Sequence, residues 1–175
     1  MGKTILYIAA SLDGFIAGAD DDLSWLNPYQ GVENGYKEFL ASIGAIIEGR
    51  RTYDIEVKNG WEKLHAIPLF VLSKNAPAKK PTRTGVTFMH EDIAEVLHKA
   101  KQVTDKNVWI EGGANVAQQF ISRWLIDEIV LTIIPVLLGD GIRLFDNIHG
   151  RFNLSLTDVK RFDKGMIQLV YKVEK

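Results

Sequence analysis

Short apolar runs of strand length alternate along this chain with segments whose apolar residues repeat at helical spacing. The run Thr4–Ala10 carries no charge, which is typical of strands buried on both faces of a parallel sheet. In the segment Glu33–Ile43, apolar residues fall at positions i, i+3, i+4 and i+7, which form one stripe along a helix. This alternation predicts an α/β domain with a largely parallel sheet.

The same patterns assign most of the chain to regular elements. Further strands are expected at Ala45–Glu48, Leu69–Leu72, Val86–Met89, Val108–Ile110 and Glu128–Leu138. Further helices are expected at Ile93–Ala100 and Asn115–Trp124. Near the C-terminus the pattern changes, because strands at Leu154–Phe162 and Met166–Val173 flank the turn signal Asp163–Gly165. Antiparallel strands are therefore expected at this end of the sheet.

Composition narrows the possible functions. A chain of 175 residues fits a single domain over residues 1–175. Its 21 basic and 22 acidic residues give a net charge of −1, so neither nucleic acid nor an anionic membrane is expected as a partner. The chain has no cysteine, and its four histidines lack ligand spacing, so we expect no metal. The apolar stretches are too short to span a bilayer, and we expect a soluble, cytoplasmic protein.

Two predicted strands end in motifs suited to binding a phosphate group. Gly49–Thr52 reads Gly-Arg-Arg-Thr and combines a tight turn, a helix start with free N–H groups and two guanidinium groups that can clamp a phosphate. Leu72–Lys74 places a hydroxyl group and a cation at the next strand end. Each motif taken alone could also be a solvated turn.

The third motif, Glu111–Asn115, reads Glu-Gly-Gly-Ala-Asn between a strand and a helix. Its glycines allow the backbone to approach a pyrophosphate closely, with the helix dipole behind it, although a turn required by packing is an alternative. The Gly-x-Gly-x-x-Gly and P-loop patterns are absent from the sequence, which disfavours a Rossmann dehydrogenase and a P-loop enzyme. Because parallel strands end at the same sheet edge, the three motifs together predict a groove for a phosphorylated dinucleotide, with basic groups favouring a 2′-phosphate.

The order of these motifs resembles the dihydrofolate reductase superfamily, specifically the branch similar to the RibD C-terminal domain of riboflavin biosynthesis. The segments that carry the resemblance are Ile8–Ala17, Gly49–Tyr53, Val71–Ser73, Trp109–Gly113 and Ile134–Gly141. The resemblance runs from about residue 4 to the C-terminus. It implies a three-layer α/β/α domain and hydride transfer from NADPH to a pyrimidine- or pterin-like heterocycle, as in 5-amino-6-(5-phosphoribosylamino)uracil reductase.

The resemblance also implies which residues hold the cofactor. The adenosine and its 2′-phosphate would be held by Gly49, Arg50, Arg51, Thr52, Leu72, Ser73 and Lys74. The pyrophosphate would be held by Gly112, Gly113, Ala114, Asn115 and Val116. The nicotinamide pocket would be lined by Ala10 and Ile16.

A proton must accompany the hydride, and two acids are candidate catalytic residues. Dihydrofolate reductase has a carboxylic acid a few residues past the tryptophan of its first long loop, whereas Trp25 here is followed by Leu-Asn-Pro-Tyr-Gln. Asp13 and Glu111 lie near the predicted cleft, where burial could raise the pKa of either. Asp13 could instead be a turn residue, and Glu111 could orient the ligand. Trp25 is the candidate for stacking on the substrate, because of its place in the loop.

Two alternative functions stay open from the sequence. One is dihydrofolate reductase itself, which the missing acid weakens. The other is a non-catalytic NADP(H)-binding module that would bind the nucleotide without turnover. We also expect a homodimer, because the apolar strand ending at Leu138 is longer than a small sheet needs and the riboflavin-branch domains pair through this region.

Overall fold

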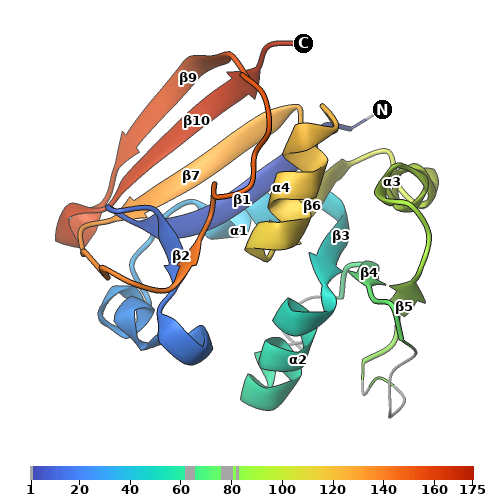
Figure 1. The fold of residues 1–175 in the computed structure, drawn as a ribbon, viewed down its shortest axis with the longest axis horizontal. Coiled ribbons are helices and arrows are strands. Elements are labelled where there is room, and N and C mark those ends of the chain that lie inside the picture. The colour runs from blue at the N-terminus through green and yellow to red at the C-terminus, as the bar shows by residue number, and fades with distance from the viewer. Residues whose placement is uncertain (1, 62–65, 76–80, 82) are drawn as a thin grey trace.

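Eight strands form one central sheet (Figure 1) in the computed structural model, which describes residues 2–61, 66–75, 81 and 83–175. The strands are β1 (Thr4–Ser11), β3 (Ile43–Gly49), β4 (Leu69–Leu72), β5 (Val86–Met89), β6 (Asn107–Gly112), β7 (Glu128–Ile134), β9 (Leu154–Arg161) and β10 (Ile167–Val173). Their order is β5-β4-β3-β6-β1-β7-β10-β9. The strands from β5 to β7 run parallel, and β10 is antiparallel to both β7 and β9. The predicted α/β fold with antiparallel C-terminal strands is confirmed.

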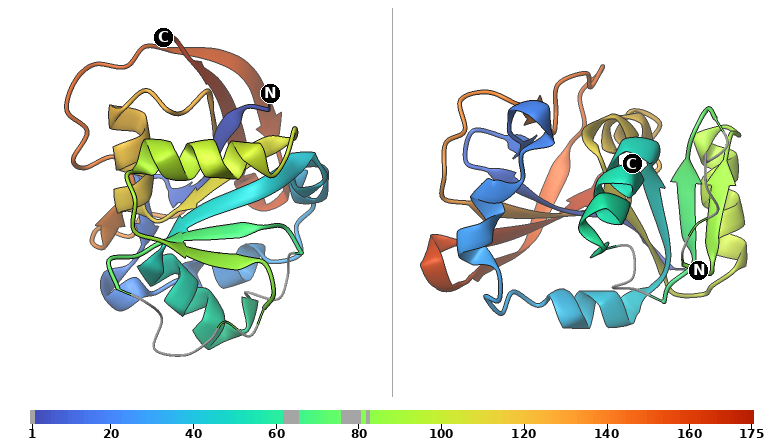
Figure 2. Two further views of the ribbon diagram at one scale, coloured as in Figure 1. Left: turned by 90° about the vertical axis from the view of Figure 1, so that its right-hand side faces the viewer. Right: turned by 90° about the horizontal axis from the view of Figure 1, so that it is seen from below.

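Helices cover both faces of this sheet (Figure 2). They are α1 (Tyr36–Ser42), α2 (Arg50–Asn59), α3 (Ile93–Gln102) and α4 (Ala114–Ser122). The larger core lies under α3 and α4, and a second core lies under α1 and α2. Side chains alternate between the two, so that Leu6 of β1 packs in the first core and Tyr7 against the second. Strands buried on both faces in this way account for the continuous apolar runs of the sequence.

Two predicted elements are shorter than the sequence pattern suggests. The strand predicted to reach Leu138 ends at Ile134, because Pro135 has no N–H group to donate to a sheet. The N–H of Val136 instead bonds the Ile134 carbonyl, 2.8 Å away. The helix predicted from Glu33 begins at Tyr36, after Gly35 takes a left-handed conformation at φ 75°. None of the helices in the described ranges is long and apolar enough to cross a membrane.

A small second sheet, which the sequence pattern did not predict, joins two loops beyond the central strands. It pairs β2 (Phe15–Ala17) with β8 (Ile142–Arg143). Gly141 precedes β8 with φ 131°, and a Cβ there would come within 2.1 Å of the Ala17 carbonyl oxygen. A glycine is therefore required for the two loops to meet.

We predict that Phe120→Ala strongly destabilises the fold. Phe120 of α4 has no exposed surface and lies in the core between α4 and the sheet. Truncating a fully buried phenylalanine costs about 3–5 kcal/mol, because apolar burial is lost and a cavity is left. Urea unfolding measures the change, with Val103→Ala at a 54% exposed position as the control, expected within about 0.5 kcal/mol of wild type. A loss below about 1 kcal/mol at Phe120 would contradict this packing.

Candidate active site

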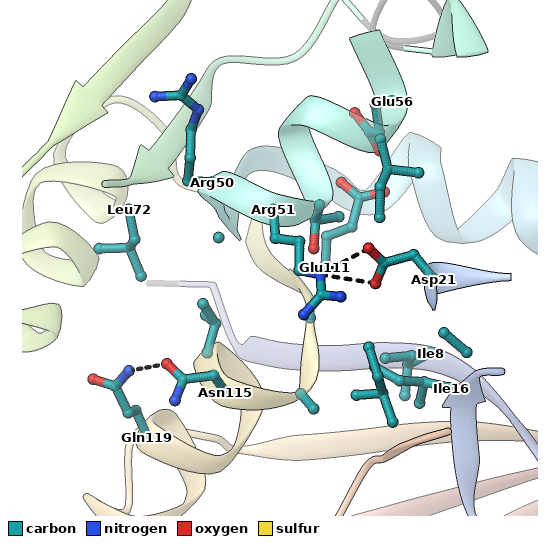
Figure 3. Close-up of a pocket in the computed structure, with 18 of the residues that line it drawn as sticks. Ile8, Ile16, Asp21, Arg50, Arg51, Glu56, Leu72, Glu111, Asn115 and Gln119 are labelled. Carbon is teal, nitrogen blue, oxygen red and sulfur yellow. Dashed lines mark hydrogen bonds and ion pairs between the residues drawn. The ribbon is translucent and has the colours of Figure 1, made fainter. Parts of the chain in front are cut away.

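A cavity of about 770 Å³ lies at the carboxyl ends of the parallel strands (Figure 3). Two helices begin at its wall, α2 directly after Gly49 of β3 and α4 after Gly113, which follows β6. Among the described contacts no side chain caps either helix, and neither has an acid in its first turn. In α3, by contrast, the Asp92 side chain accepts a hydrogen bond from the Ala94 N–H. The N-termini of α2 and α4 are therefore free to bind an anion.

The two glycines before these helices stand where the backbones approach each other. A Cβ added at Gly49 would lie 3.0 Å from Cγ2 of Val116, and one added at Gly113 would lie 3.3 Å from Oγ1 of Thr52. A side chain at either position would crowd the opposite helix start. The peptide bond between Gly112 and Gly113 is cis.

The two adjacent arginines do not form one clamp, as the sequence suggested they could. The Nε atom of Arg50 lies 2.8 Å from the Asp54 carboxylate, and its guanidinium group sits over the Phe88 ring, 5.7 Å from the ring centre. Arg51 points the other way (Figure 3), where its Nε lies 2.8 Å from the Asp21 carboxylate. Consecutive helical residues face different directions, so the two cations serve two sides of the cavity.

Asp13 does not line this cavity. Its carboxylate accepts hydrogen bonds from the Ser11 hydroxyl at 2.6 Å and from the N–H groups of Gly139 at 2.8 Å and Leu138 at 3.1 Å. The Ser11 hydrogen bond, followed by these backbone N–H groups, lowers the pKa of Asp13 to about 2. The side chain is therefore ionised at neutral pH and ties the first loop to the loop after β7, which suits it poorly to donating a proton.

Glu111 lines the cavity and has the opposite electrostatics. Burial raises its pKa well above the ordinary value, and the nearby charges of Glu56 and Glu48 raise it further. The register of β3 on β6 explains its position, because Ile47 pairs with Ile110 whereas Glu48 pairs with Gly112. Glu111 is skipped in this register as the extra residue of a bulge, a feature that often redirects side chains near active sites.

Most of the predicted site residues meet at this cavity. In addition to Glu111, the predicted residues that line it are Ile16, Gly49, Arg50, Arg51, Thr52, Leu72, Ser73, Lys74, Gly113, Ala114, Asn115 and Val116. Ala10 and Gly112 are buried beside it without lining it. Trp25 does not line it either and packs against Ile134 and Met166, while Leu23 and Leu26 of the same loop face the cavity. The binding roles themselves stay predictions.

The sequence analysis missed an aromatic wall next to Glu111. Tyr7, Tyr36 and Trp109 line the cavity, and their ring centres lie 6.0–6.2 Å apart. The Trp109 Nε1–H donates to the Tyr7 carbonyl at 3.0 Å, which fixes the indole ring. Glu56 was missed as well, although it follows Thr52 by four residues and therefore shares its helix face.

A family model described as the RibD C-terminal domain matches residues 3–168. The chain belongs to this family. The uncharacterized protein YwjB of Bacillus subtilis (strain 168) is 35% identical over 97% of both chains, which agrees with the assignment.

Two solved structures show which known folds this RibD C-terminal family member resembles. A protein of Shewanella sp. PV-4, whose name assigns it to riboflavin biosynthesis, is 26% identical, with a TM-score of 0.88 over 99% of both chains. Dihydrofolate reductase from Enterococcus faecalis, complexed with NADP(H) and RAB-propyl, is 20% identical, with a TM-score of 0.71 over 99% of this chain and 98% of that one. The second likeness shows the fold alone, and it confirms the predicted dihydrofolate-reductase-like architecture.

We predict that Asp13→Asn destabilises this family member in a pH-dependent way. A carboxyl group whose pKa is lowered by folding, here from 3.8 to about 2, stabilises the fold fully above the higher value. The contribution is lost as the pH falls through about 2. Urea unfolding at several pH values should show a deficit at neutral pH that vanishes in strong acid. Asp20→Asn, in the same loop and exposed, is the control, and a pH-independent deficit at Asp13 would contradict the assignment.

Proposed function

We propose that this protein is a cytoplasmic reductase that uses NADPH to reduce a pyrimidine- or pterin-like heterocycle, similar to 5-amino-6-(5-phosphoribosylamino)uracil reductase. The observation that carries the proposal is the pair of uncapped helix N-termini, α2 and α4, on a cavity that also holds arginines and a lysine. Membership of the RibD C-terminal domain family supports it. So does the fold shared with a dihydrofolate reductase whose structure was solved in complex with NADP(H).

The residues present fit this dinucleotide. The N–H groups at the start of α4 and the adjacent Gly113 would hold the pyrophosphate, because no side chain among the described residues caps this helix. Arg50, Arg51 and Lys74 line the same cavity and would bind phosphate groups of the dinucleotide, the two arginines from different sides. Ile16 offers an apolar contact for the nicotinamide ring. When bound, NADPH supplies a hydride, and the chain must orient the partner ring and exclude water.

The aromatic wall and Glu111 are suited to the heterocycle. Tyr36 and Trp109 provide ring faces for stacking, and the Glu111 carboxyl group lies at the same wall. Reduction of a C=N or C=C bond places the hydride on one atom and requires a proton on its neighbour. Glu111 keeps a proton more readily than an ordinary glutamate because its pKa is raised, so we assign it the proton donor role in preference to Asp13.

We predict that the protein binds NADPH more tightly than NADH in calorimetric titrations. Arg51→Ala and Lys74→Ala should each weaken NADPH binding roughly tenfold or more, since a charge-assisted hydrogen bond contributes about 1.5–3 kcal/mol. NADH binding should change less, and Lys101→Ala, near the far end of α3, should change neither.

A panel of aminopyrimidines and pterins, followed by the loss of NADPH absorbance, then tests turnover. Oxidation that depends on Glu111 supports the reductase. Binding without oxidation by any ring would favour the non-catalytic nucleotide-binding module. Failure to bind either nucleotide would remove the basis of the proposal.

The proposed reductase is also a homodimer, although not for the reason that the sequence suggested. The apolar strand β7 lies between β1 and β10, so burial inside the sheet accounts for its composition. An uncovered surface lies instead on β9, all eight of whose residues are exposed. Its register places Leu156 and Val159 beside Tyr171 and Leu169, on the face that α3 and α4 cover elsewhere. In Figure 1 the ribbons of β9 and β10 extend beyond α4. A second copy related by a two-fold axis would cover this apolar face.

We predict that sedimentation gives about twice the chain mass of 19.7 kDa. Leu156→Lys should shift the protein toward the monomer, because the new charge would be buried in the pairing face. Ser155→Lys, at the neighbouring position with its side chain on the opposite face of the strand, is the matched control and should stay dimeric. A wild-type mass equal to that of one chain would disprove the dimer.

A further inference from the structure

Three glutamates from three elements meet behind the aromatic wall. One carboxyl oxygen from each of Glu48, Glu56 and Glu111 lies within 4.8 Å of the other two. Glu48 is the second-last residue of β3, Glu111 is the bulged residue of the adjacent β6, and Glu56 reaches them from α2. Figure 3 shows the Glu111 side chain extending toward Glu56. The sequence offers no local signal for this cluster, because the three residues are far apart along the chain.

Glu48 is the unusual member of this carboxyl cluster. Its side chain is fully buried, and neither carboxyl oxygen has a hydrogen-bond partner among the described residues. Glu48 does not line the cavity, whereas Glu56 and Glu111 do. A buried carboxylate without a partner is strongly unfavourable, so a group in this position is retained only if something neutralises it.

Like charges at this spacing cannot all be ionised in a buried site, so the cluster must hold protons or a cation. Three other groups surround the cluster. The charge of Arg83, before β5, lowers the pKa of both Glu48 and Glu111. Asp54 on α2 raises the pKa of Glu48, and Tyr36 on α1 lies near Glu111. Because Arg83 already places a positive charge near both groups, protons are favoured over a second cation.

Burial and like charge favour the protonated form of the carboxyl cluster. Burial raises the pKa of both Glu48 and Glu111. The charge of Glu56 raises the pKa of both groups further, and Glu48 and Glu111 repel each other when both are ionised. Glu111 also hydrogen-bonds Glu56 through its side chain. Because Glu48 does not line the cavity, Glu111 is the group with a raised pKa that a substrate can reach.

We propose that Glu48, Glu56 and Glu111 form one proton-holding unit, in which Glu48 and Glu56 are positioning residues that keep the Glu111 carboxyl group protonated at the cavity wall. This proposal rests on the proposed reductase function, because the proton of Glu111 is transferred to a substrate only if the protein is a reductase. In the reaction the O–H bond of Glu111 breaks, and a new N–H or C–H bond forms on the substrate atom next to the carbon that receives the hydride. Water in the open cavity then returns a proton to the carboxylate.

The test uses the free protein with ¹³C-labelled glutamate carboxyl groups, titrated by NMR between acid and mildly alkaline pH. The Glu111 resonance, assigned by its loss in Glu111→Gln, should titrate well above the ordinary glutamate value of about 4.3. In Glu48→Gln and Glu56→Gln its midpoint should fall by about one pH unit or more, because a like charge has been removed. Glu38→Gln on the exposed side of α1 is the control and should leave the midpoint unchanged.

A second readout is the pH dependence of unfolding. A glutamate whose pKa is raised by folding stabilises the protein below its unfolded pKa, and this contribution is lost as the pH rises through the raised value. The stability of Glu48→Gln relative to wild type should therefore increase as the pH is raised from acid to alkaline values. This comparison also shows whether the variant folds, and Glu56→Gln provides an independent variant if it does not.

The outcomes test the carboxyl cluster independently of the proposed reductase function. A Glu111 midpoint near the ordinary value, or one unmoved in both Gln variants, would overturn the cluster even if NADPH binds. A raised midpoint that falls in both variants supports it even if NADPH does not bind. Saturable binding of Mg²⁺ at neutral pH, abolished in Glu48→Gln, would make the cluster a cation site and would also overturn the proposal.

Discussion

The close approach of β3 to β6 is the constraint on which the rest of the site depends. A Cβ at Gly49 would stand 3.0 Å from Cγ2 of Val116, so a glycine here lets the first turns of α2 and α4 come together without crowding. This contact brings two helix N-termini to one cavity and directs their unpaired N–H groups to the same place. The arginines of α2, the bulged Glu111 and the aromatic wall are all arranged around that junction.

Asp13 and Glu111, the two acids that the sequence placed near the cleft, show how the environment sets the role of a carboxyl group. Asp13 is surrounded by hydrogen-bond donors, which stabilise its negative charge. Its carboxylate therefore holds two loops together. Glu111 lies in a largely desolvated position with two acids beside it, so its neutral form is favoured. Their chemistry is nearly identical, and hydrogen bonding and burial make one a structural anion and the other the proposed proton donor.

The sequence predicts the layers of the fold and the strand ends at the cavity, because apolar periodicity and glycine-rich turns are local properties. It does not predict side-chain direction where that depends on three-dimensional packing. Trp25 was expected at the substrate but points into the core against Met166, with its neighbours Leu23 and Leu26 at the cavity instead. Glu48 looked like an ordinary strand end, and its meeting with Glu111 requires a bulge that no pattern in the sequence indicates.

The exposed strand β9 has a consequence for the behaviour of the protein in concentrated solution. It pairs only with β10 and forms the edge of the sheet, so one side of its backbone could add strands from other molecules. Asp158, Lys160 and Arg161 lie along this strand, and a register irregularity interrupts its pairing with β10. Charged side chains and bulges are the usual protection of such edges against aggregation. In the proposed homodimer, this strand would provide an apolar face for pairing and a protected edge, which favours a closed pair over an open fibre.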